Sequence, residues 1–129
     1  MRLSRVVPLG ALLLTALGCA RNTEEEYTEP SQAANAEVAI VVDNHYWSDV
    51  NVYLLYGGVK QRLGMVPSVS TRAFFVPWRQ LGSGGAVRLR ADPIGGKRGL
   101  VSETVLVQPG QQIHWTLESR LESSSVGVY

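Results

Sequence analysis

Few residues of this chain are of the types that do catalytic chemistry. It has 129 residues, with two histidines, His45 and His114, and a single cysteine, Cys19. Histidine is the usual general base, and it needs a nucleophile or an acid within hydrogen-bonding reach. His114 alternates with apolar neighbours in a predicted strand, so it faces outward. A single cysteine excludes an intramolecular disulfide and a thiolate cluster for zinc or iron–sulfur.

The segment 43–49 places several polar side chains around His45. Asp43, His45 and Asp49 supply oxygen and nitrogen atoms that a divalent cation could use. Their spacing matches neither the patterns of zinc ligands nor a calcium-binding loop. The same segment suits a polar turn in which Asp43 and Asn44 bond to their own backbone. We therefore expect a turn here, with no metal and no cofactor.

The glycine-rich segments lack the context that catalytic motifs need. Residues 81–85 (LGSGG) contain glycine and serine, but not with the Gly-x-Ser-x-Gly spacing of a nucleophile elbow. Residues 95–99 (GGKRG) precede a predicted strand, whereas a phosphate-binding loop precedes a helix. The acidic residues of the domain are scattered, and no catalytic carboxylate pair can be assigned. The sequence thus predicts a protein that is not an enzyme and that acts by binding.

The first 18 residues have the pattern of an export signal. Arg2 and Arg5 precede residues 6–17, a run without charged side chains. This run is shorter than the roughly 20 apolar residues that a transmembrane helix requires. A buried core helix would show a polar face, which the run does not have. We expect residues 1–18 to be a cleaved signal peptide.

The cysteine follows this run directly, in the sequence TALGC at residues 15–19. The segment resembles the lipobox of bacterial lipoprotein precursors, although Ala16 stands where the commonest form has leucine. The resemblance implies cleavage between Gly18 and Cys19, and acyl chains such as palmitate on the cysteine thiol and the new amino group. Several acyl chains hold a protein on a membrane more firmly than one. The alternative is a free thiol after an ordinary cleaved signal.

The residues after the cysteine indicate a location and a linker. In diderm bacteria an aspartate after the lipidated cysteine favours the inner membrane, and Ala20 stands there instead. The resemblance thus implies the outer membrane, with the protein facing the periplasm or the cell surface. Residues 19–36 have four glutamates, one aromatic and no branched aliphatic residue, which is typical of a disordered linker. A coil over residues 20–36 would span about 20–25 Å.

Residues 37–118 have the pattern of an all-β domain. Runs of Val, Leu, Tyr, Phe and Trp alternate with polar residues, between segments rich in Gly, Pro, Asn and Asp. Residues 57–58, both glycine, suit a primed two-residue turn. Pro77 ends a strand or places it at a sheet edge. The predicted strands cover about 38–42, 50–56, 59–66, 69–78, 87–92, 100–107 and 113–118.

About seven strands joined by short turns predict a small antiparallel β-sandwich, immunoglobulin-like or transthyretin-like in outline. A small closed barrel is the alternative. In the strand 59–66 we expect Lys60 and Arg62 to face outward, with Leu63 and Met65 among the candidates to face inward. The tail, residues 119–129, either frays or adds an edge strand.

The charge balance restricts the class of partner. The chain has 12 Lys+Arg and 11 Asp+Glu, a net charge of +1. Loss of residues 1–18 removes two arginines and leaves ten basic against eleven acidic residues, a net charge of −1. This is far from the positive surplus that holds a protein on nucleic acid phosphates. We therefore expect no nucleic acid partner.

Two arginines share one outward face of a predicted strand. Arg88 and Arg90 alternate with apolar residues, and Arg72 or Glu103 is a candidate cross-strand neighbour. Such a face could hold an anionic partner, for example the phosphate of lipid A or an acidic protein surface. The alternative is an ordinary charged face that limits aggregation of a β protein.

The aromatic residues at strand ends leave a similar choice. Tyr46, Trp47 and Trp78 are either core residues or contact residues.

We expect a lipid-anchored envelope lipoprotein whose β-sandwich has a structural or accessory role and contacts an envelope protein. The alternative is a module that binds carbohydrate or an anionic glycolipid, through the arginine-bearing face or the aromatic loop ends.

Overall fold

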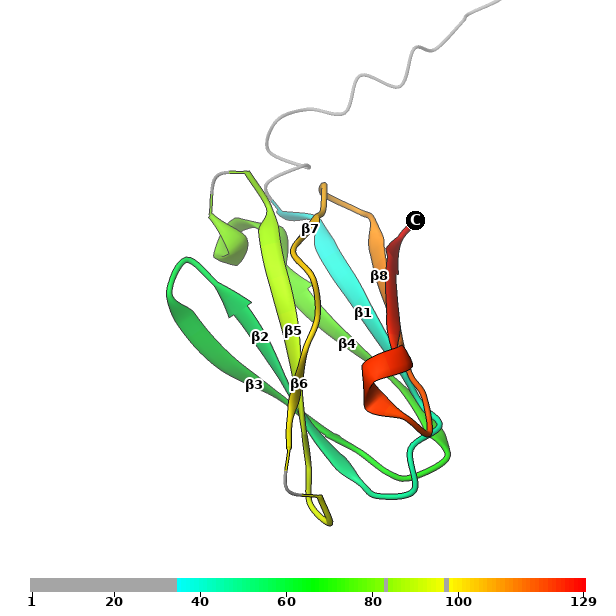
Figure 1. Ribbon diagram of the computed structural model, residues 1–129. Helices are drawn as coiled ribbons and strands as arrows, with labels where there is room; N and C mark the ends of the chain where they lie inside the picture. The colour runs from blue at the N-terminus through cyan, green and yellow to red at the C-terminus, as the bar shows by residue number, and fades with distance from the viewer. Residues whose placement is uncertain (1–34, 83, 97) are drawn as a thin grey trace, which may run out of the picture.

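The computed structural model describes residues 35–82, 84–96 and 98–129, which form two β-sheets packed face to face (Figure 1). The predicted signal peptide, Cys19 and the linker before residue 35 lie outside the described residues. Sheet A has the strand order β4-β1-β8-β9 and comprises β1 (Glu37–Asn44), β4 (Ser70–Pro77), β8 (Gln112–Leu117) and β9 (Ser125–Val128). Sheet B has the order β3-β2-β5-β6, with β7 also paired to β5, and comprises β2 (Val50–Tyr56), β3 (Val59–Val66), β5 (Ala86–Pro93), β6 (Leu100–Val101) and β7 (Val105–Leu106). Two short 3-10 helices, η1 (Trp78–Leu81) and η2 (Leu121–Ser123), lie between strands.

The all-β class and the sandwich architecture are confirmed. The described residues form nine strands, because the predicted strand 100–107 is divided into β6 and β7 and the tail adds β9 at the edge of sheet A. The pairing is antiparallel except between β1 and β8, which run parallel. The barrel alternative is wrong, because the two sheets of the described part do not close on each other.

The order of the strands distinguishes between the two predicted outlines. In an immunoglobulin domain the first two strands lie in the same sheet. Here β1 lies between β4 and β8 in sheet A, whereas β2 lies between β3 and β5 in sheet B. Of the two outlines, the transthyretin-like one therefore remains.

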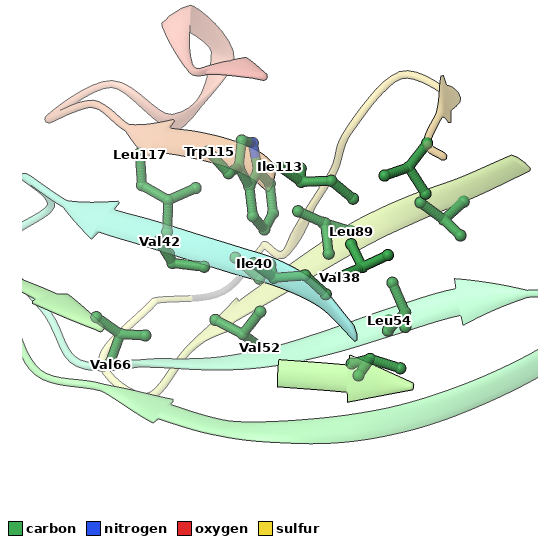
Figure 2. Packing of buried hydrophobic residues seen from close by; sticks show 14 of the residues in the cluster. Val38, Ile40, Val42, Val52, Leu54, Val66, Leu89, Ile113, Trp115 and Leu117 are labelled. Carbon is green, nitrogen blue, oxygen red and sulfur yellow. The ribbon is translucent and has the colours of Figure 1, made fainter. Parts of the chain in front are cut away.

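The core lies between the sheets and follows the period-two alternation of the strands. In β1, Val38, Ile40 and Val42 are buried, and they face buried residues of sheet B (Figure 2). Trp115 of β8 is the largest side chain that is fully buried among the described residues. The other members are Val50, Val52, Leu54, Val66, Val76, Leu81, Val87, Leu89, Ala91, Val107, Ile113 and Leu117.

The β2–β3 hairpin agrees with one prediction and corrects another. Gly57 and Gly58 have φ values of 53° and 77°, as a primed turn requires. The register between β2 and β3 shifts after Val52, which is the signature of a β-bulge. The extra residue changes the alternation, so Leu63 packs against the core as predicted but Met65 pairs with outward-facing Asn51. The inward assignment of Met65 is wrong for this reason.

The turn between β3 and β4 contains a strained residue. Val69 has a φ of 53°, a conformation that is unfavourable for a β-branched residue, and its side chain is 78% exposed. Val69→Gly is expected to raise the free energy of unfolding by about 0.5–1 kcal/mol, because relief of strain exceeds the entropy that glycine loses on folding. Denaturant unfolding measures the change. Val59→Gly, at an exposed strand position without positive φ, is the control and should destabilise; a destabilised Val69→Gly would contradict the strain argument.

Candidate functional site

The polar segment around His45 places two carboxylates beside one partly exposed imidazole ring. His45 Nε2 lies 3.1 Å from Asp43 Oδ2, and His45 Nδ1 lies 3.6 Å from Glu118 Oε2. The two carboxylates therefore approach opposite nitrogens of one imidazole ring. Asp49 is engaged elsewhere, since its Oδ1 accepts a hydrogen bond of 2.8 Å from the Ser68 amide. The structure does not bring the three candidate metal ligands together.

The described residues contain no group of three or more His, Cys, Asp or Glu side chains arranged to hold a metal ion. His114 lies in β8, half-buried on the outward face of sheet A, where it pairs with Val41 and Gly127. It is thus on a different element from His45, which follows the end of β1.

Asn44 organises the loops at the end of the sandwich beyond β1. It is fully buried, and its Nδ2 donates to the carbonyl oxygens of Ser48, Val66 and Pro67 at 3.0, 3.2 and 3.1 Å. Its Oδ1 accepts a hydrogen bond of 2.9 Å from the Tyr46 amide. The predicted turn, with a side chain bonded to its own backbone, is confirmed for Asn44.

The corresponding prediction for Asp43 is wrong. Its Oδ1 accepts a hydrogen bond of 2.9 Å from the hydroxyl of Thr71 on β4, instead of bonding to nearby backbone. The reason is the register of sheet A, which places Thr71 directly opposite Asp43.

Four basic side chains gather on the outward face of sheet B. The register forms two rows across three strands, because residues paired across strands share a face of the sheet. Leu55 pairs with Lys60 and Arg88 in one row, and Tyr53 pairs with Arg62 and Arg90 in the next. We call Lys60, Arg62, Arg88 and Arg90 the cationic face.

The four side chains of the cationic face differ in the neighbours that they contact. Lys60 Nζ lies 4.2 Å from the centroid of the Tyr53 ring, a cation–π arrangement. Arg62 Nη2 donates to Asn51 Oδ1 at 2.9 Å. Arg90 Nε is 2.8 Å from Asp92 Oδ1, a salt bridge to a half-buried carboxylate. Arg88 has no ion-pair partner in the described part of the chain.

A hollow of about 400 Å³ continues the cationic face toward the β2–β3 hairpin. Its lining includes the side chains of Leu55, Lys60, Arg88 and Thr104. The lining of the hollow therefore includes two basic residues, apolar residues and a threonine. This arrangement suits a compact anionic group such as a phosphate.

The sequence predicts part of this face and misses part of it. The shared face of Arg88 and Arg90 is confirmed. Lys60 faces outward as predicted, but its place beside Arg88 depends on Leu55 of β2 lying between the two strands. Arg72 is not a neighbour; it lies on β4 of sheet A, where its Nη1 donates to the carbonyl oxygen of Met65.

The aromatic residues at strand ends separate into two groups. Trp78 is half-buried and packs against the core, and its ring lies over Gly85, where a Cβ atom would come within 2.6 Å of Trp78 Cη2. Tyr46 also packs against the core. Trp47 is 64% exposed. Trp78 and Tyr46 are thus core residues at least in part, whereas Trp47 is free for contact.

Within the described ranges we find no helix with the length and apolarity needed to cross a bilayer. No protein-family model matches the chain, and no curated protein sequence matches it.

Proposed function

We propose that this protein is a lipid-anchored lipoprotein of the bacterial cell envelope that acts by binding. The lipobox at residues 15–19 supports acylation of Cys19, and Ala20 supports the outer membrane as its location. The linker would let the sandwich stand off the membrane, facing the periplasm or the cell surface. The role is structural or accessory, with an envelope protein as partner.

The observation that carries the binding role is the cationic face. Its four basic side chains lie in the rows of Tyr53 and Leu55, and Asp92, which forms a salt bridge with Arg90, pairs with Asn51 in the adjacent row. A flat sheet face with guanidinium groups and a central tyrosine suits an acidic protein surface, since arginine and tyrosine are enriched at interface hot spots. Complementary charge also accelerates encounter.

A second candidate ligand is an anionic glycolipid, and the hollow beside the cationic face favours it. Lys60 and Arg88 line this hollow together, so a single phosphate could meet both charges. The β2–β3 hairpin and the start of β5, which line this hollow, lie at the end of the sandwich where β1 begins (Figure 1).

Site-directed cross-linking in cells tests the binding role. With benzoylphenylalanine in place of Tyr53, we expect a discrete cross-linked product, and Arg88→Glu with Arg90→Glu should lower its yield by about tenfold or more, because like charges then face the partner. The same photoreactive residue in place of Val41, on the outward face of sheet A, is the matched control and should not give this product.

The product identifies the partner class. A cross-linked protein with an acidic surface supports the first candidate, and a cross-linked lipid A species supports the second. An unchanged yield after charge reversal, or an equal product from the Val41 position, would show that the cationic face is not the binding surface.

A further inference from the structure

A well-anchored loop holds Trp47 in an exposed position. The loop between β1 and β2 carries Trp47 beside Ser48, which is buried. The Ser48 hydroxyl accepts a hydrogen bond of 2.8 Å from the Gly95 amide, which ties this loop to the one after β5. A Cβ atom at Gly95 would lie 2.7 Å from Trp47 Cη2, so the indole rests against the glycine. The indole is therefore supported on one side by the loop after β5, and restriction of a side chain before binding reduces the entropy that binding costs.

The surface beside Trp47 is hollowed, with a volume of about 370 Å³. Tyr46, Arg98, Arg120 and Glu122 also line this hollow. The rings of Tyr46 and Trp47 have their centroids 5.3 Å apart and are tilted by 45°. The volume lies in the range of small-molecule sites. One wall of the hollow is thus aromatic, and the other residues offer both hydrogen-bond donors and an acceptor.

The charged groups of the hollow favour an anionic ligand. Arg98 and Arg120 have no ion-pair partner among the residues that the structure describes, and Glu122 lies more than 4.0 Å from both guanidinium groups. Two guanidinium groups and one carboxylate leave one positive charge in excess. A guanidinium can hold a carboxylate by two parallel hydrogen bonds.

We propose that this hollow binds an acidic saccharide, that is, a pyranose ring with a carboxylate. The apolar C–H face of the sugar would stack on the exposed Trp47 ring, whose π surface is electron-rich. Arg98 and Arg120 would hold the carboxylate, and Glu122 would accept hydrogen bonds from hydroxyl groups. The hollow uses no residue of the cationic face, so the assignment stands or fails independently of the proposed function.

The position of the hollow suits the binding of a polymer that lies away from the membrane. It is built from the β1–β2, β5–β6 and β8–β9 connections, at the end of the sandwich opposite the start of β1 (Figure 1). The linker joins the chain at the start of β1, so this hollow would face away from a lipid anchor. Two sources would supply a free sugar carboxylate: muramate of cell-wall glycan without its stem peptide, and uronate of an acidic polysaccharide.

Calorimetric titration of the full chain, purified in detergent, tests the proposal. The probes are a muramate oligosaccharide, a uronate oligosaccharide and the carboxyl-reduced form of each. We expect saturable binding of at least one acidic probe, and binding of its reduced form weaker by about tenfold or more. The acidic probe that binds identifies the source. Binding of neither acidic probe, or equal binding of acidic and reduced forms, would overturn the proposal.

Variants place the binding in the hollow. Trp47→Ala should weaken binding by about tenfold or more, and Trp47→Phe, which keeps an aromatic face, should weaken it less. Arg98→Gln with Arg120→Gln should abolish the preference for the acidic probe over its reduced form. Arg79→Gln, at an exposed position in η1 after β4, is the matched control and should bind normally. Unchanged affinity in Trp47→Ala would overturn the assignment.

Discussion

Replacing Asn44 with alanine is expected to lower the free energy of unfolding by about 3 kcal/mol or more, since each buried polar group left without a partner costs about 1–3 kcal/mol. The substitution removes the donor to the carbonyl oxygens of Ser48, Val66 and Pro67, and the acceptor for the Tyr46 amide. Denaturant unfolding of the wild-type and variant chains measures the change. A small domain has a total stability of about 5–15 kcal/mol, so the loss would be a large fraction of it.

A residue of β2, the next strand along the chain, offers a matched control for this prediction. Asn51 lies on the outward face of β2, where its Oδ1 accepts one hydrogen bond from Arg62 at an exposed site. Asn51→Ala is expected to change the free energy of unfolding by about 0.5 kcal/mol or less. Equal effects of the two substitutions would show that Asn44 does not hold the loops together.

Loss of the lipid anchor should release the protein from the membrane almost completely. The test chain has an ordinary cleavable secretory signal in place of residues 1–18 and carries Cys19→Ala, so it is exported without a site for acyl chains. Each buried methylene group of an acyl chain stabilises membrane binding by about 0.8 kcal/mol, so loss of the acyl chains removes many such contributions at once. We expect this chain in the soluble periplasmic fraction and the wild-type chain in the membrane fraction.

The matched control is Ser31→Ala in the wild-type chain, a substitution in the linker that leaves Cys19 intact. It should remain with the membrane. If the chain with Cys19→Ala also stayed in the membrane fraction after a salt wash, then something other than acylation of this cysteine would hold it there.

Local patterns suffice to predict much of the fold. Alternation places Val87, Leu89 and Ala91 inward and Arg88 and Arg90 outward, because strand geometry alone decides which face a side chain takes. The failures have a common cause in the pairing between strands, which the pattern within a single strand does not determine. The bulge that turns Met65 outward arises from the register with β2, and Gly64, next to the extra residue, is the local signal of it within residues 59–66.

The candidate sites show the same limit. Alternation within β5 predicts that Arg88 and Arg90 lie together, but Lys60 joins them through the order of three strands. Trp47 and Trp78 have similar surroundings in the sequence, each at the end of a strand. Their different exposure depends on which loop folds over each ring, and this is decided by tertiary contacts.

The parallel pairing of β1 and β8 also could not be predicted from the sequence. The two strands are separated by most of the domain, and parallel neighbours need a long crossover that leaves no local turn signal. This pairing joins β8 to the same sheet as β1 and so brings Glu118 beside His45. The approach of Glu118 to His45 at this end of the sandwich follows from it.

The most direct test of the central claim, that this is a lipid-anchored envelope lipoprotein, is the intact mass of the wild-type chain extracted from membranes of a diderm host. We predict a chain that begins at Cys19 and carries the added mass of acyl chains on the thiol and the amino group. An unmodified chain in the periplasm, with a free Cys19 thiol or a different first residue, would contradict the claim.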